Sequence, residues 1–170
     1  MDGDTLRALQ APLKARYRDD PDAAVITLTA TGDVDGTGVS CRVETGRALV
    51  EAGLHPATGG DGSLACSGDM LLQALAACAG VTLRAVATAI GVEIRGARVV
   101  AEGDLDVRGT LGVDRAAPVG FREIRLRVEV DTDAGADELA TLLRLTERYC
   151  VVLQTLRGAV PVHADAVRAG

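Results

Sequence analysis

The sequence predicts an α+β fold in which antiparallel strands pack against helices. The expected elements follow the order strands, helix, strands, helices and a last strand, rather than a regular alternation of strand with helix. Residues 98–108 and 121–131 alternate apolar with charged side chains, a pattern typical of antiparallel strands that expose one face to water. The segment 67–90 is apolar on nearly every side and therefore belongs in the centre of the fold or of an oligomer.

The first 22 residues are expected to form a helical extension to a single main domain over residues 23–170. Pro12 lies inside this predicted helix and is expected to kink or divide it, because proline lacks a backbone N–H. Apolar side chains recur at helical spacing between residues 4 and 18, at Leu6, Leu9 and Leu13.

Two strands are expected next, over 24–32 and 38–46, joined by the turn-forming sequence DVDGTG. On the second strand Cys41 shares one face with Val39 and Val43, so its thiol is interpreted as a core side chain. A glycine-rich loop then leads to the central helix.

The central helix is expected to begin with Ser67 as its N-cap and to stop at Gly91. It is almost long enough to span a bilayer, which takes about 20 apolar residues. Its many alanines, the charged Arg84 and the lack of basic flanks favour a core helix of a soluble protein instead.

A second helix is expected over 136–150, because apolar residues recur there at three- and four-residue steps. Cys150 falls on the same inward stripe as these apolar residues. The segment 151–160 is expected to continue as a further turn or helix, and 161–167 to form a last edge strand.

Composition argues against several classes of function. The net charge is −6 and aromatic residues make up 2% of the chain, which argues against binding to nucleic acid or to an anionic membrane surface. The four cysteines form no CxxC pair and lie at no zinc-site spacing with the two histidines, so neither a disulfide scaffold nor a metal centre is expected. The start MDGDTLRALQ lacks the basic and apolar regions of a signal peptide, and we expect a cytoplasmic protein.

The two thiols on the inward faces of the predicted helices, Cys78 and Cys150, allow two interpretations. Both can be inert core side chains, since free cysteine packs as a small hydrophobe. They can also form a redox pair, which requires Cα atoms within roughly 4.4 to 6.8 Å of each other. Sequence alone leaves both interpretations open.

A reactive Cys78 needs help from outside its own helix. Burial raises the pKa of a thiol, and Cys78 lies about 14 Å from the helix N-terminus, beyond the reach of the helix dipole. A cation from the preceding strands, Arg42 or Arg47, is the candidate activator. Cys66, in the loop just ahead of the helix, is an alternative reactive thiol.

The segments SGDMLLQALAACAGVTLRAVATAIGV and, downstream, ERYCVVLQTL resemble the OsmC/Ohr family of hydroperoxide-reducing proteins, and the resemblance extends over about 24–167. It implies an OsmC-like fold, with curved antiparallel sheets wrapped around two long central helices. It also implies an intertwined homodimer whose active sites lie at the subunit boundary.

The resemblance implies that Cys78 is the peroxidatic cysteine and Cys150 the resolving cysteine. The expected enzyme is a thiol-dependent peroxidase that reduces organic hydroperoxides through a sulfenic acid and an intramolecular Cys78–Cys150 disulfide. It needs no metal or bound cofactor, and its reductant is an external thiol: a dihydrolipoyl protein, thioredoxin or a small thiol.

The activating groups differ from the family pattern. The resemblance places Val34 where relatives carry the activating arginine, and the neighbouring carboxylate position is filled by the shorter Asp69. Our hypothesis is that Arg42 or Arg47, paired with Asp69, replaces the arginine–carboxylate pair of the relatives. The alternative function is a non-catalytic OsmC-like dimer that binds a small apolar ligand, with both cysteines structural.

Overall fold

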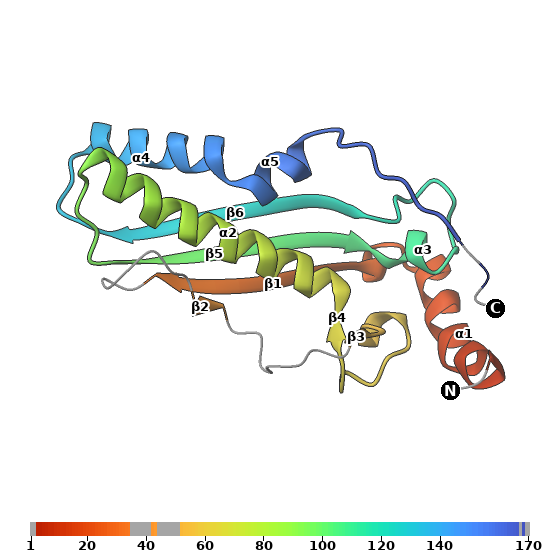
Figure 1. Cartoon of the computed structure of the whole chain (residues 1–170). Coiled ribbons are helices and arrows are strands. Elements are labelled where there is room, and N and C mark those ends of the chain that lie inside the picture. The colour runs from red at the N-terminus through yellow and green to blue at the C-terminus, as the bar shows by residue number, and fades with distance from the viewer. Residues whose placement is uncertain (1–2, 35–41, 44–51, 167, 169–170) are drawn as a thin grey trace.

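A four-stranded antiparallel sheet forms the base of the structure. The computed structural model describes residues 3–34, 42–43, 52–166 and 168, with side chains for all of these except 3–7, 28–34 and 42–43. The strand order is β2-β1-β5-β6, with helices over one face (Figure 1). Its strands are β1 (Val25–Val34), β2 (Arg42–Val43), β5 (Gly96–Asp106) and β6 (Phe121–Asp131).

Within the described residues, five α-helices accompany the sheet. The long helix α2 (Ser67–Ile90) contacts β1, β5 and α4, as Figure 1 shows. The mixed α+β class and the predicted central helix are therefore confirmed. The other helices are α1 (Gly3–Asp19), α3 (Val107–Thr110), α4 (Ala136–Tyr149) and α5 (Val151–Arg157), and the short elements are η1 (Asp22–Ala24), η2 (Pro56–Thr58), β3 (Ala52–Gly53) and β4 (Ala65–Cys66).

The predicted alternation of β5 separates its two faces. Val99 and Ala101 are fully buried under the helices. On the outer face Asp104 accepts from Arg125 of β6 at 2.6 Å. Burial of one apolar face against α2 therefore sets the register of this strand pair.

Strand β5 ends earlier than the alternation predicts, at Asp106 instead of 108. The Asp106 carboxylate accepts from the backbone N–H of Arg108 and caps helix α3. Asp106, expected on the solvated face, is buried, and its charge is paired with Arg108 at 2.6 Å. The alternation pattern cannot reveal this side-chain cap, which competes with strand continuation.

The ends of α2 agree closely with prediction. The helix stops at Gly91, which has a left-handed φ of 74° that glycine adopts without strain. Its N-cap is Cys66 and not Ser67, which is the first helical residue. By length and composition α2 could cross a membrane, and half of that stretch is buried inside the fold.

Pro12 was predicted to kink or divide the first helix, and α1 is continuous through it, so the proline does not divide the helix. It is attached to the loop ahead of α2 by two hydrogen bonds. The Tyr17 hydroxyl donates to the carbonyl of Ala57 at 2.9 Å, and the Gln10 amide donates to that of Thr58 at 3.1 Å.

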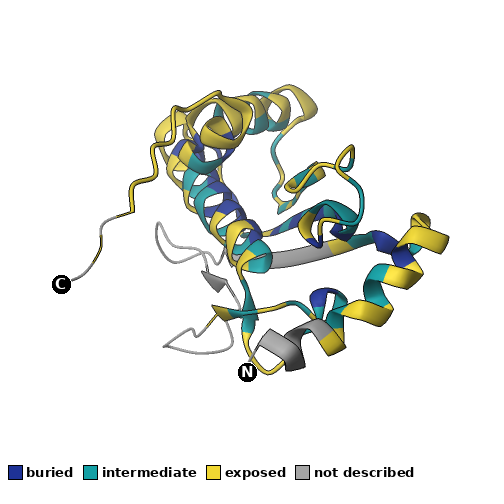
Figure 2. Cartoon of the chain, turned by 90° about the vertical axis from the view of Figure 1, so that its right-hand side faces the viewer, coloured by how far each residue is buried: buried dark blue, intermediate teal, exposed yellow. Residues whose placement is uncertain are grey.

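The predicted last strand is absent from residues 161–166, and residue 167 lies outside the described part of the chain. These residues are exposed, and Val162 is 86% exposed. The segment runs away from the sheet as a tail (Figure 2). A strand needs a neighbour for its backbone hydrogen bonds, and within the described chain this segment has none.

The core lies between the helices and the sheet, with the outer sides of the helices exposed (Figure 2). Leu75 of α2 is fully buried in the cluster that also contains Val99 and Cys150. A second cluster joins Leu83 of α2 to Leu142 of α4, so the two long helices pack together as predicted.

Replacing Leu75 tests this core. We expect Leu75→Ala to lower the free energy of unfolding by about 2–5 kcal/mol, because it removes buried methyl groups and leaves a cavity. The matched control is Val162→Ala in the exposed tail, which should change it by less than about 0.5 kcal/mol. Equal urea midpoints for the two variants would contradict the placement of Leu75.

Candidate functional site

Cys78 lies halfway along α2 and is half-buried. It packs against the core cluster that contains Cys150 and Leu153. The structure therefore brings together the two thiols that were predicted to face one another. Both cysteines are free thiols.

Cys150 lies between two helices rather than inside one. It is the C-cap of α4 and also the N-cap of α5, with φ −70° and ψ 106°. Its side chain is fully buried. This extended residue turns the chain, so that α5 begins beside Cys78 with its first N–H groups unpaired within the helix.

Hydrogen bonds to the Cys78 sulfur outweigh the effect of burial on its acidity. Burial raises the pKa of this thiol, but the backbone N–H of Val152, the Cys150 thiol, the Thr82 hydroxyl and the backbone N–H of Val151 lower it. The net result is a pKa below the ordinary value of 9.0. Donors to a thiolate stabilise its charge, so Cys78 is the more nucleophilic thiol of the pair.

The pKa of Cys150 moves in the opposite direction, to about 11. Burial is the largest cause. The backbone N–H groups of Leu153 and Val152 lower the pKa, whereas hydrogen bonding to Cys78 and the charge of the Cys78 thiolate raise it. Of the two thiols, Cys78 therefore loses its proton first, and Cys150 keeps its proton to a higher pH.

The expected turn or helix after residue 150 is confirmed as α5, but sequence reasoning missed Thr82 and the role of the first N–H groups of α5. Thr82 lies four residues after Cys78, one turn further along the same helix, and this spacing could have identified it. The break between α4 and α5 carries no proline or glycine, so no local signal pointed to the amides of Val151 and Val152.

The proposed arginine clamp stays a prediction. The side chain of Arg42 and the whole of Arg47 lie outside what the structure describes, as does Cys41. Asp69 lies in the first turn of α2, about 14 Å along the axis from Cys78, so these two are not neighbours. The described groups that lower the pKa of Cys78 carry no positive charge.

Cys66 and His55 both have structural roles in the segment that leads into α2. Cys66 is half-buried at the start of α2 and packs against the same core cluster as Cys78. His55 caps the short helix η2, where its Nδ1 accepts from the backbone N–H of Ala57 at 3.0 Å. Within the described ranges, no group of three metal-ligating side chains is present.

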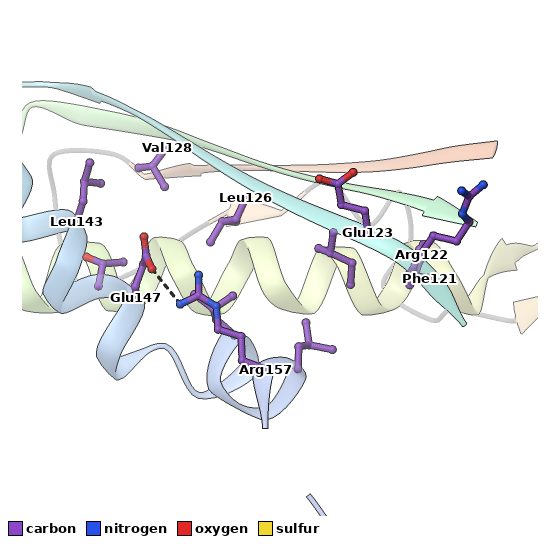
Figure 3. A pocket seen from close by; sticks show the side chains of 12 residues that line it. Phe121, Arg122, Glu123, Leu126, Val128, Leu143, Glu147 and Arg157 are labelled. Carbon is purple, nitrogen blue, oxygen red and sulfur yellow. Dashed lines mark hydrogen bonds and ion pairs between the residues drawn. The ribbon is translucent and has the colours of Figure 1, made fainter. Parts of the chain in front are cut away.

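A cavity of about 430 Å³ lies between β6 and helices α4 and α5 (Figure 3). Leu153, which packs with Cys150, forms part of its wall. Neither Cys78 nor Cys150 lines it.

Comparison with known proteins agrees with this architecture. The family model of the OsmC-like proteins matches residues 60–165. An OsmC-like hydroperoxide resistance protein from Jannaschia sp. CCS1 has a similar structure, with a TM-score of 0.59 and 16% identity over 85% of this chain and 95% of that one. An OsmC-like protein from Mycoplasma pneumoniae gives a TM-score of 0.56 and 19% identity over 76% of this chain and 86% of that one.

No curated protein matches the sequence. The family match covers more than half of the chain, including both Cys78 and Cys150. The structural likeness is independent support for the fold, with helices over an antiparallel sheet. The chain therefore belongs to the family of OsmC-like proteins.

Proposed function

We propose that this chain is a thiol-dependent peroxidase that reduces organic hydroperoxides, with Cys78 as the nucleophile and Cys150 as the resolving thiol. The observation that carries the proposal is the placement of an acidified, half-buried thiol against a second, protonated thiol. Membership of the family supports it, as does the similarity to a protein described as a hydroperoxide resistance protein.

In the proposed first step the Cys78 thiolate attacks the terminal oxygen of the hydroperoxide. The S–O bond forms, the O–O bond breaks, and the alkoxide takes up a proton and leaves as an alcohol. Cys78 is then a sulfenic acid. The N–H groups of Val151 and Val152 stabilise the charged sulfur before the attack.

In the second step the Cys150 sulfur attacks the sulfenic sulfur, and water leaves as the disulfide forms. Oxidation of Cys78 removes its negative charge, which contributes to the raised pKa of Cys150. The resolving thiol therefore becomes more acidic only after the first step. Two external thiols then reduce the disulfide and are themselves oxidised to a disulfide.

A homodimer is part of the proposal. Helix α2 buries one side, while its opposite side leaves an apolar stripe exposed that includes Leu71 and Val81, each 38% exposed. Ala74, Cys78 and Ala85 follow the same three- and four-residue spacing. Covering this stripe with a second copy would remove apolar surface from water and bring the partner beside Cys78.

Peroxide turnover tests the chemistry. We expect the unmodified protein to consume cumene hydroperoxide with a dithiol, and Cys78→Ser to abolish turnover because the nucleophile is lost. After one equivalent of peroxide, the intact mass should fall by two hydrogens in the unmodified protein and rise by one oxygen in Cys150→Ser.

The control for this experiment is Cys66→Ser, which should retain turnover. Turnover that survives Cys78→Ser and disappears in Cys66→Ser would assign the reaction to the Cys66 thiol. No turnover by any variant would favour the non-catalytic dimer.

The acidity of Cys78 depends on Thr82. Replacing Thr82 with the similarly shaped valine removes one donor to the thiolate, so the pKa of the Cys78 thiol should rise. Alkylation of Cys78 by iodoacetamide, mapped by mass spectrometry, should then reach half its maximal rate at a correspondingly higher pH.

Two variants control for helix effects. Thr82→Ser keeps the hydroxyl and should preserve the pH profile. Thr88→Val removes the hydroxyl that donates to the Arg84 carbonyl at 2.9 Å, and should leave the profile unchanged. The same profile in Thr82→Val as in the unmodified protein would contradict the assigned role of Thr82.

Val81→Asp tests the dimer. A charge in the apolar stripe should disfavour association, so sedimentation should give the mass of one chain, compared with twice that mass for the unmodified protein. Val119→Asp, at an exposed site away from α2, should stay dimeric. A monomeric unmodified protein would refute the proposed dimer directly.

A further inference from the structure

The cavity between β6, α4 and α5 has the properties of a small-molecule site. Its volume of about 430 Å³ falls in the range of ligand sites, roughly 300–1,000 Å³. Side chains from all three elements line it (Figure 3). Its apolar wall includes Phe121, Ile124, Leu126, Val128, Leu153 and Leu156.

The charges around the cavity indicate which ligand it suits. Two arginines and two glutamates line it, so their charges cancel. Arg157 and Glu147 pair with each other across α4 and α5 at 2.9 Å, drawn as a dashed line in Figure 3. A charged ligand would bring an uncompensated charge into this balanced, largely apolar site, so an uncharged ligand fits best.

Helix α5 connects this cavity to the thiol pair. Leu153 and Leu156 of α5 line the cavity, while the N–H groups of its first two residues, Val151 and Val152, act on the Cys78 sulfur. The helix has only seven residues, and so short a helix depends on tertiary contacts for its stability.

Helix α5 is held by apolar packing on its inner side and by polar contacts at the surface. Leu153 and Val152 pack in and against the core cluster. The Gln154 side chain donates to the Glu147 carbonyl at 2.7 Å, next to the ion pair of Glu147 with Arg157, and such exposed contacts are weak. A ligand in the cavity would add apolar packing to the cavity side of α5 and so hold the helix more firmly.

We propose that the cavity binds an uncharged alkyl or aryl molecule, and that its occupancy raises the reactivity of Cys78 by holding α5 against the sulfur. The inference rests on Cys78 being the reactive thiol, as proposed above, but not on a peroxide being its substrate. The other groups on this sulfur, the Thr82 hydroxyl and the Cys150 thiol, lie outside the cavity wall. Of all these described neighbours only Cys150 titrates.

Linkage gives the sign of the coupling. A ligand that packs on Leu153 and Leu156 favours the position of α5 in which its N–H groups stabilise the thiolate. By reciprocity the thiolate form must bind the ligand more tightly than the neutral form. The ratio of these two affinities equals the factor by which the ligand raises the acid dissociation constant of the thiol.

The test uses N-phenyl-naphthylamine, an uncharged aryl fluorophore, with decanol as an alkyl competitor. We expect saturable binding of the probe to the full chain and its displacement by decanol. Ile124→Trp fills the cavity and should weaken binding at least tenfold, and Leu126→Trp is a second such variant. Val119→Trp, outside the cavity, should bind normally, and urea unfolding should confirm that each variant folds.

The coupling is measured separately, by the rate of iodoacetamide alkylation at Cys78 followed by mass spectrometry. Saturating probe should raise this rate about fivefold below the thiol pKa in the unmodified protein, and leave it unchanged in Ile124→Trp. Cys78→Ser, which cannot ionise, should bind the probe about fivefold more weakly at a pH above that pKa.

Either of two results overturns the inference: no probe binding that responds to cavity filling, or binding that leaves Cys78 alkylation unchanged. Absence of peroxide turnover, with probe binding and coupled alkylation intact, would refute only the proposed peroxidase. The two proposals therefore fail separately.

Discussion

The contact between the first N–H groups of α5 and the Cys78 sulfur is the interaction on which the site depends. Burial deprives the Cys78 thiolate of hydration, and this effect alone would raise the pKa of the thiol. The start of α5 replaces lost water with fixed donors, because Cys150 adopts an extended conformation between two helices. Cys150 thus supplies the second thiol and also orients the backbone N–H groups that lower the pKa of Cys78.

This arrangement separates the roles of two chemically identical groups. The more exposed thiol receives several donors and is the nucleophile of the proposed reaction, whereas the fully buried thiol has the higher pKa and keeps its proton longer. The charge of the Cys78 thiolate itself contributes to the raised pKa of Cys150, so the second thiol cannot ionise easily until the first has reacted. In the proposed reaction, the order of the two steps follows from these electrostatic effects.

Sequence patterns predicted those parts of the fold whose periodicity reflects burial against one neighbour. The alternation of β5 and β6 and the apolar surface of α2 belong to this group, as does the inward position of Cys150. Two features escaped because they depend on contacts that periodicity does not encode. Asp106 ends β5 through its own side chain, and within the described residues the segment 161–166 has no strand to pair with.

The two cysteines of the candidate site could be identified from the sequence, but the groups that lower the pKa of Cys78 could not. Spacing identified Cys78 and Cys150, yet the search for an activator considered side-chain cations and α2's own dipole. Backbone N–H groups are invisible to that search, because every residue carries one and only the fold decides where they point. The donors came from α5, whose position depends on the packing of Leu153 beneath Cys150. The acidity of Cys78 is therefore a property of how α5 packs, and any change in that packing reaches the sulfur directly.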